Sequence, residues 1–338
     1  MTSSLSQTRA RAGGGRPLVS VLIPCYNAEP FVCEAVESAL DQTCGGVEVI
    51  VADDGSSDGS VGAIRRRFGS AVRVESLPNR GACAARNRAF ELSRGRFIQF
   101  LDADDLLTPD KLEKQLPPLL SGEADLVFSK GMLFGDGRPA RPKKRPVRRP
   151  EGEDPFVYCL SQGLSTVGPL HRRECIEKVG GFREGVRRAQ ELDLHLRLAA
   201  TNVRILLLEE CLYSVREHAG PRITRSSQPP DQMLKLLLEL ADLLEAPPYE
   251  LTAPRRDALA GALIQHSLNA YRHGAEGSAA AGLRRARQLS PRADYDERRW
   301  YKAGARLVGP LSMEWVLKQA RRRRDALRGG WPRAGGGR

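Results

Sequence analysis

Short apolar runs alternate with segments of helical periodicity over the first hundred residues of the chain. Short apolar runs that predict strands occupy residues 18–23, 47–52, 72–76 and 97–101, and the first of them is rich in β-branched residues. Between them, apolar residues recur at helical spacing over residues 34–42, 61–68 and 83–92. Strands and helices that alternate in this way predict an α/β fold, with a doubly wound, mostly parallel sheet flanked by helices.

The pattern is weaker in the middle of the chain. A short apolar run at 126–128 predicts a strand, and the Pro- and Arg-rich stretch after it predicts a loop. Farther on, we expect helices at 174–179 and 192–200 and a strand at 205–208. We assign this part of the chain to the same α/β domain.

Leucine, alanine and arginine dominate the chain after Pro229-Pro230 and recur at helical spacing. The helices predicted there cover residues 233–244, 256–271 and 279–289. We therefore divide the chain into three parts: a disordered basic leader at 1–16, an α/β domain at 17–228, and a helical C-terminal extension with a basic tail at 229–338.

The composition is ordinary for a soluble globular protein, with 41% hydrophobic and 28% charged residues. No apolar run approaches the roughly 20 residues that a membrane-spanning helix needs. The leader is small, polar and basic and has no apolar segment, which distinguishes it from a secretory signal. We therefore expect a cytoplasmic protein.

The seven cysteines are scattered along the chain and form no Cys-x-x-Cys pair. Their odd number and irregular spacing do not suggest a disulfide framework. A zinc site would need a second Cys or His at ligand spacing, and none stands there. The pattern predicts reduced, mostly buried thiols.

The formal charge of +12 is concentrated in two segments. Residues 138–149 hold seven cations in twelve positions, and residues 318–324 hold five more. Such a surplus is compatible with binding to a nucleic acid, an anionic membrane surface or an anionic substrate. Solvated loops and a charged helix face are the alternative explanation.

Polar residues follow the first three predicted strands, at the end of a parallel sheet where such folds bind ligands. Residues 24–27, Pro-Cys-Tyr-Asn, provide a rigid turn and an aromatic face that can stack on a nucleobase. Asp54 can accept a hydrogen bond from a base N–H, and Gly55 allows a tight turn behind it. Residues 79–81 and 86–87 add a cation and amide donors.

Two acids in an Asp-x-Asp spacing, Asp102 and Asp104, follow the fourth strand. Crowded carboxylates repel one another unless a cation neutralises them. The spacing therefore indicates a divalent metal ion and, through it, a diphosphate ligand. Taken alone, the triplet could also be a solvated acidic turn.

In their order and spacing, these four motifs resemble those of the family 2 glycosyltransferases, inverting enzymes with the GT-A fold. The resemblance covers about residues 18–218. It implies that Tyr26 and Asp54 hold the nucleobase and that Pro24 shapes the base pocket. It also implies that Arg86 lies near the base or the phosphates, and it adds Gly81 to the donor-binding residues.

For the acid triplet, the resemblance implies that Asp102 lies beside the ribose and the metal, that Asp104 is the principal metal ligand and that Ala103 contacts the donor. A Mg²⁺ or Mn²⁺ ion there would neutralise the leaving diphosphate. His218 stands where the family often has an Arg-x-His motif, either as a further metal or phosphate ligand or as a surface residue. Arg222 and Arg225, in the loop after it, either close over the diphosphate or are solvated.

The family's general base is usually an Asp before a helix of the form Asp-x-Asp-Leu-x-x-Arg. The corresponding run is 190–197, and the register of its arginine puts Glu191 at the base position. Glu in place of Asp adds a methylene, so the acceptor would sit slightly farther away. The alternatives are that Glu191 is only a helix N-terminal acid and that Asp193 is the base. We expect His195 to be structural.

The resemblance implies an enzyme that moves a sugar from a nucleotide-diphosphate donor, most often a UDP-sugar, to a glycan or lipid-linked acceptor. Such an enzyme would serve the synthesis of a cell-surface polysaccharide or glycoconjugate, with its basic segments at the inner face of the cytoplasmic membrane and no nucleic-acid partner. One alternative is a nucleotidyltransferase, which would show a Gly-rich basic loop after the first strand. The other is a non-catalytic protein that binds a nucleotide sugar or a polyanion.

Overall fold

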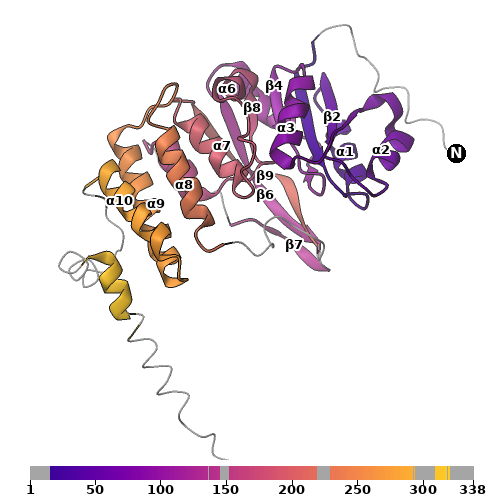
Figure 1. The fold of residues 1–338 in the computed structure, drawn as a ribbon. Coiled ribbons are helices and arrows are strands. Elements are labelled where there is room, and N and C mark those ends of the chain that lie inside the picture. Colours follow the sequence, from indigo (N-terminus) through magenta and orange to yellow (C-terminus); the bar gives the residue numbers. More distant parts are fainter. Residues whose placement is uncertain are drawn as a thin grey trace, which may run out of the picture. The chain divides into compact units, whose positions relative to one another are not determined.

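The computed structural model describes residues 16–135, 137–144, 152–218, 229–291, 293, 309–317 and 319. The chain divides into two compact units (Figure 1): residues 1–225 with 247–250, and residues 226–246 with 251–338. Four predicted features lie outside the described residues: the leader up to residue 15, the end of the first basic run at 145–149, the arginines Arg222 and Arg225, and the cations of the basic tail.

Four parallel strands make one half of the sheet in the first unit, in the order β3-β2-β1-β4. Their bounds are β1 (Val19–Cys25), β2 (Val47–Asp53), β3 (Arg73–Ser76) and β4 (Phe97–Phe100). The helices between them are α1 (Val32–Leu40), α2 (Ser60–Phe68) and α3 (Ala82–Leu92), and the 3₁₀ turn η1 (Gly69–Ala71) precedes β3. The predicted parallel α/β arrangement is confirmed.

The other half of the sheet mixes parallel and antiparallel pairs, in the order β4-β8-β6-β9-β5. Its strands are β5 (Leu106–Leu107), β6 (Leu126–Gly135), β8 (Leu170–Arg172) and β9 (Ile205–Glu217). Long strands β6 and β9 run parallel, whereas β8 is antiparallel to both of its neighbours. The associated helices are α4 (Lys111–Leu120), α5 (Pro155–Gln162), α6 (Arg173–Val179) and α7 (Gln190–Ala199).

The prediction of a loop after residue 128 is wrong for part of the Pro- and Arg-rich stretch. Strand β6 continues to Gly135, and β7 (Arg138–Pro142) returns beside it as the antiparallel arm of a hairpin. Prolines are tolerated there because an edge strand has backbone positions that need no N–H donor. Glycines at 135 and 137, both with positive φ, flank the reversal.

The core of the first unit forms around the parallel strands. The side chains of β1 at Val19, Val21 and Ile23 are fully buried, and α1 covers them with one apolar face. Burial of each such side chain contributes about 1.5–3 kcal/mol. The carboxyl ends of the strands are thereby held in fixed positions, and the polar loops start there.

The second unit contains the helices α8 (Gln232–Leu243), α9 (Ala253–Arg272) and α10 (Glu276–Leu289), and residues 310–317 are also helical. Helices α8, α9 and α10 confirm those predicted in the C-terminal part. Gly282 of α10 faces Ser267 of α9 so closely that a Cβ would overlap its hydroxyl, so these two helices pack closely there. In the described ranges, no helix has the combination of length and apolar character needed to cross a membrane.

Candidate functional site

The loops after β1 and β2 are tied together and present an open aromatic ring. Asn27 has a left-handed backbone (φ 49°), which asparagine tolerates better than most residues. Its N–H donates to Ser56 Oγ at 2.9 Å, and its Oδ1 accepts from Ser57 N at 2.8 Å. Tyr26, next to it, is 54% exposed, so its ring is available for stacking beside Pro24, the residue before Cys25 at the end of β1.

Asp54 is buried at the end of β2, with 4% of its surface exposed. Its Oδ1 accepts from the Arg80 N–H at 2.8 Å and its Oδ2 from the Gly81 N–H at 2.9 Å. Gly81 precedes α3 with φ 94°, a conformation that favours glycine. A carboxylate has about four lone-pair sites, so Asp54 holds the third loop in place and can still accept a hydrogen bond from a ligand.

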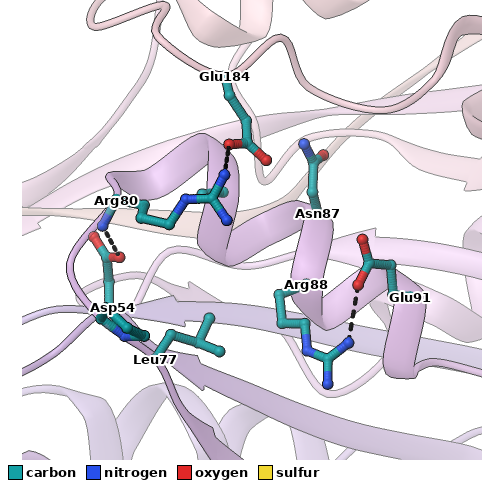
Figure 2. Close-up of a pocket in the computed structure, with 9 residues that line it drawn as sticks. Asp54, Leu77, Arg80, Asn87, Arg88, Glu91 and Glu184 are labelled. Atoms are coloured by element: carbon teal, nitrogen blue, oxygen red, sulfur yellow. Dashed lines mark hydrogen bonds and ion pairs between the residues drawn. The ribbon is translucent and has the colours of Figure 1, made fainter.

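A cavity of about 120 Å³ adjoins Asp54 and is lined by Asp54, Leu77, Pro78, Arg80, Ala84, Asn87, Arg88, Glu91 and Glu184. Figure 2 shows Arg80 and Glu184 pointing toward each other at its rim. Their ion pair is 2.6 Å long, but both side chains are exposed, so it stabilises the fold by less than about 1 kcal/mol. It does connect the loop after β3 with the loop before α7.

Arg86 of α3 links the acid triplet to the start of α7. Its Nη2 donates to Asp102 Oδ1 at 2.7 Å and its Nη1 to Gln190 Oε1 at 2.6 Å. The guanidinium lies 5.1 Å from the ring centroid of Phe182 and is buried. Because Gln190 directly precedes Glu191, the predicted metal site and the predicted base belong to one connected network.

The acids after β4 differ in environment. Asp102 and Asp104 are partly exposed, and Asp104 Oδ2 lies 3.2 Å from His218 Nε2. The next residue, Asp105, is buried, and its Oδ1 accepts from the Arg216 N–H at 3.1 Å. Burial, followed by the charges of Asp102 and Asp104, raises the pKa of Asp105 well above its ordinary value. Asp102 and Asp104 are therefore accessible to a ligand, whereas Asp105 is buried and bonded to the backbone of β9.

Arg216 fixes the end of β9 beside this triplet. Its Nε donates to the Asp104 carbonyl at 3.1 Å and its Nη2 to Glu34 of α1 at 2.7 Å. The guanidinium lies between two aromatic rings, 5.1 Å from the centroid of Phe31 and 4.5 Å from that of Phe134. The contacts hold the backbone of Asp104 and bring His218, two residues later, to its carboxylate.

The donor set suits a hard divalent cation. Mg²⁺ and Mn²⁺ prefer oxygen ligands, and Mg²⁺ is usually bound by one or two carboxylates together with substrate phosphates. Asp104 and Asp102 supply such carboxylates, with the His218 imidazole beside them. Within the described part of the chain, no cluster of three His, Cys, Asp or Glu residues could hold a metal by itself. The residues therefore fit an ion that is bound together with a diphosphate.

Glu191 lies in the first turn of α7, after a strained residue. Ala189 has φ 54°, a left-handed conformation that costs energy for a residue with a Cβ. Burial raises the pKa of Glu191, while the nearby charges of Arg86 and Lys143 lower it. A partly buried carboxylate with a raised pKa is suited to accept a proton near neutral pH.

Asp193 has a structural environment. It is 1% exposed, and its carboxylate accepts from Arg183 Nε at 2.7 Å and from Arg197 Nε at 2.9 Å and Nη2 at 2.7 Å. Arg197 also donates to the carbonyls of Val179 and Gly181. No oxygen of Asp193 faces an open space, which favours Glu191 as the base. His195 is buried and stacks on His171, in agreement with a structural role.

The structure groups the predicted residues into two sets. Pro24, Tyr26, Asp54 and Gly81 belong to the linked loops after β1, β2 and β3, whereas Arg86, Glu191 and the triplet with Ala103 and His218 surround the end of β4. Sequence reasoning missed four further residues: Gln190, Asp105, Arg216 and Lys143. Asp105 and Arg216 adjoin predicted site residues, but Lys143 had no signal of its own within the basic run.

Comparisons with known sequences agree with these motifs. The family model described as Glycosyl transferase family 2 matches residues 20–180. TuaG of Bacillus subtilis, a glycosyltransferase provisionally assigned to teichuronic acid biosynthesis, is 39% identical over 206 residues, which are 60% of this chain and 79% of TuaG. Escherichia coli WfgD, a UDP-Glc:alpha-D-GlcNAc-diphosphoundecaprenol beta-1,3-glucosyltransferase, is 38% identical over 114 residues, 33% of this chain and 44% of WfgD.

Solved structures share the fold. Residues 1–349 of S. aureus TarS, crystallised with UDP-GlcNAc, superpose with a TM-score of 0.68 at 19% identity, over 90% of this chain and 92% of that one. The mannosyltransferase PcManGT of Pyrobaculum calidifontis, in complex with GDP-Man and Mn²⁺, superposes with a TM-score of 0.53 at 20% identity, over 90% and 88%. The predicted GT-A-like fold is confirmed, and the chain belongs to glycosyltransferase family 2.

Proposed function

We propose that this glycosyltransferase acts with inversion, moving a sugar from a nucleotide diphosphate directly to a hydroxyl acceptor. The observation that supports this most strongly is the position of Arg86, which bonds both to Asp102 and to the residue before Glu191. A direct displacement needs the donor phosphates and the general base on opposite sides of one carbon atom. Arg86 connects the two groups at a short, fixed separation.

On the donor side, the nucleobase stacks on Tyr26 and donates a hydrogen bond to Asp54. Pro24 shapes this pocket, and Gly81 and Ala103 line it. Asp104 and Asp102 would hold Mg²⁺ or Mn²⁺, with His218 beside them. When bound, the ion supplies positive charge to the diphosphate as it leaves. Arg86 orients Asp102, and Arg216 orients Asp104 through its carbonyl.

On the acceptor side, Glu191 takes the proton of the attacking hydroxyl. The acceptor oxygen forms a bond to the anomeric carbon, the bond from that carbon to the diphosphate oxygen breaks, and its electron pair stays on the diphosphate. A single displacement of this kind inverts the anomeric centre. The burial that raises the pKa of Glu191 also makes its carboxylate a stronger base.

We infer that the donor is a UDP-sugar and that the acceptor is a glycan or a lipid-linked saccharide at the inner face of the cytoplasmic membrane. TarS was crystallised with UDP-GlcNAc, and WfgD is named for a diphosphoundecaprenol acceptor. The provisional assignment of TuaG suggests synthesis of a cell-surface polysaccharide. Exposed cations of the basic run at 138–149, such as Arg138, would contact anionic lipid.

The proposal is tested by screening UDP- and GDP-sugars for thermal stabilisation in MnCl₂, since a ligand specific to the folded state raises the melting temperature. We expect one donor to stabilise the wild-type protein and the Asp104→Asn variant to lose that effect. The stabilising donor is then incubated with lipid-linked acceptors, and the product linkage is determined by NMR. Retention of the donor's anomeric configuration, or transfer that is unaffected by Asp104→Asn, would overturn the proposed mechanism.

A further inference from the structure

Lys143 follows β7 directly, and its side chain reaches over a buried tyrosine. Its backbone N–H donates to the Gly131 carbonyl at 2.8 Å, which fixes the end of the hairpin on β6. The ammonium lies 5.6 Å from the ring centroid of Tyr213, within the range of a cation–π contact. Lys143 is therefore directed inward, although it belongs to a run of cations that would be expected to face solvent.

The tyrosine beneath it has a fixed position. Tyr213 is fully buried, and its hydroxyl oxygen accepts from Ser165 Oγ at 2.7 Å. In the pairing of β6 with β9 it lies opposite Gly131, and a Cβ at Gly131 would overlap the ring. Only glycine at that position leaves room for the ring on which Lys143 lies.

The negative charges near Lys143 belong to acids of the proposed catalytic site. Its ammonium interacts electrostatically with Asp105, Glu191 and Asp102, although burial lowers its pKa. Tyr213 pairs with Leu107 of β5, two residues after Asp105, so the ring on which Lys143 lies is close to the acid triplet. Lys143 forms no ion pair or side-chain hydrogen bond within the described part of the chain. The ammonium therefore lies near the acids of both halves of the site without being bound to any of them.

We propose that Lys143 binds the donor diphosphate and stabilises the negative charge that develops on it during transfer. This inference rests on the proposed function. Lys143 is partly exposed and its ammonium donors are not used by the described side chains, so they are available to a ligand, and lysine binds phosphate as a compact point charge. As the anomeric carbon–oxygen bond breaks, the electron pair moves to the β-phosphate, to which Lys143 donates a hydrogen bond; no proton is transferred.

The test measures the affinity of UDP, UMP, GDP and GMP in MnCl₂ by calorimetry, for the wild type and for Lys143→Met. We expect Lys143→Met to weaken binding of the preferred diphosphate about tenfold or more, since a charge-assisted hydrogen bond is lost, and to change the monophosphate less than about twofold. Lys144→Met is the matched control, because Lys144 is the exposed neighbour with the same charge. It should bind both nucleotides like the wild type.

Other results would contradict either the role of Lys143 or the proposed function. Unchanged diphosphate affinity, or equal weakening for diphosphate and monophosphate, would mean that Lys143 only balances the nearby acids, while the proposed function would stand. A wild-type protein that binds no nucleoside diphosphate would overturn the proposed function and this inference with it. If Lys143→Met fails to fold, Lys143→Gln and Lys143→Arg replace it: Arg should keep most of the affinity and Gln should lose it.

Discussion

At the scale of single residues, burial and partners separate two acids that lie two positions apart on one helix. Glu191 is partly buried, with Arg86 and Lys143 as nearby cations, whereas Asp193 is enclosed and bonded to two arginines. A proton acceptor must be reachable by the substrate, and a carboxylate that is 1% exposed and enclosed by two arginines is not. Two carboxylates on one helix thus differ in environment, which supports the proposed chemical role of Glu191 and gives Asp193 a structural one.

This difference predicts opposite effects of two isosteric substitutions. Glu191→Gln should reduce the single-turnover rate of transfer by about 10²–10⁴ with normal donor affinity, because it removes only the proton acceptor. It should also abolish the acid limb of the rate–pH profile, which the raised pKa of Glu191 shifts above the ordinary range of glutamate. Asp193→Asn should lower the free energy of unfolding by about 3–5 kcal/mol, because it leaves the Arg197 charge buried without its partner.

Rapid-quench kinetics and urea denaturation on both variants distinguish these effects. The assignment of the base would be wrong if Glu191→Gln kept the wild-type rate. It would also be wrong if Asp193→Asn were as stable as the wild type but inactive, since Asp193 would then act in the chemistry.

The residues proposed for the donor site could be recognised in the sequence because their motifs are contiguous. Asp102 and Asp104 stand together after a strand, and their chemistry follows from that local spacing. Lys143 could not be found in this way, since its direction depends on the pairing of β7 with β6 and on the ring of Tyr213 from a third strand. Residues of this kind acquire their role through tertiary contacts alone.

At the scale of elements, the Gly180-Gly181 turn follows α6 and brings the next residue into contact with α3. This contact positions the segment that leads to α7. Both glycines have positive φ, 72° and 71°. Asn87 of α3 holds the next residue through two hydrogen bonds, since its Oδ1 accepts from the Phe182 N–H at 2.9 Å and its Nδ2 donates to the Phe182 carbonyl at 2.8 Å. Phe182 in turn lies against Arg86.

The two glycines provide a matched pair of substitutions. An added Cβ at Gly181 would lie 2.7 Å from Asn87 Oδ1, whereas one at Gly180 meets nothing within 4 Å. Gly180→Ala should therefore cost only backbone strain, about 1 kcal/mol, and leave the transfer rate close to that of the wild type. Gly181→Ala should cost at least about 1 kcal/mol more and also slow transfer, because Asn87 and Phe182 must shift beneath Arg86. Equal stability and equal rates in the two variants would show that the contact with Asn87 does not position the site.

The elements themselves were predictable to different degrees. The parallel strands β1 to β4 have continuous apolar runs, so the local sequence pattern is enough to predict them. The short strands β5 and β8 and the Pro-rich β7 have no such pattern, because pairing with longer neighbours creates them. Helix α4 contains Pro117 and Pro118 near its end, which obscures its periodicity in the sequence.

At the scale of the whole molecule, the first unit buries two histidines in its core. His171 of β8 and His195 of α7 stack with ring centroids 5.8 Å apart, and both are almost completely buried. His171 Nδ1 lies 3.2 Å from the Ile98 carbonyl, while His171 Nε2 and His195 Nδ1 have no hydrogen-bond partner in the structure. Among the described residues, the charged groups that act on the two rings are cations, Lys111 and Arg197, which together with burial favour two neutral imidazoles in the folded state.

This pair predicts how stability depends on pH. Burial lowers the pKa of His171 to about 4, whereas an unfolded chain has a histidine pKa of about 6.5. Between these values the unfolded state binds more protons, so the free energy of unfolding falls as the pH falls, by up to about 3 kcal/mol for His171 alone. Urea denaturation followed by circular dichroism at pH 7.5 and pH 5 measures this loss in the free energy of unfolding. His171→Phe removes the group, so its loss between these two pH values should be smaller by about 2 kcal/mol, whereas His273→Gln, at an exposed histidine, should leave the loss unchanged; equal losses in all three proteins would mean that the buried pair accepts a proton at little cost.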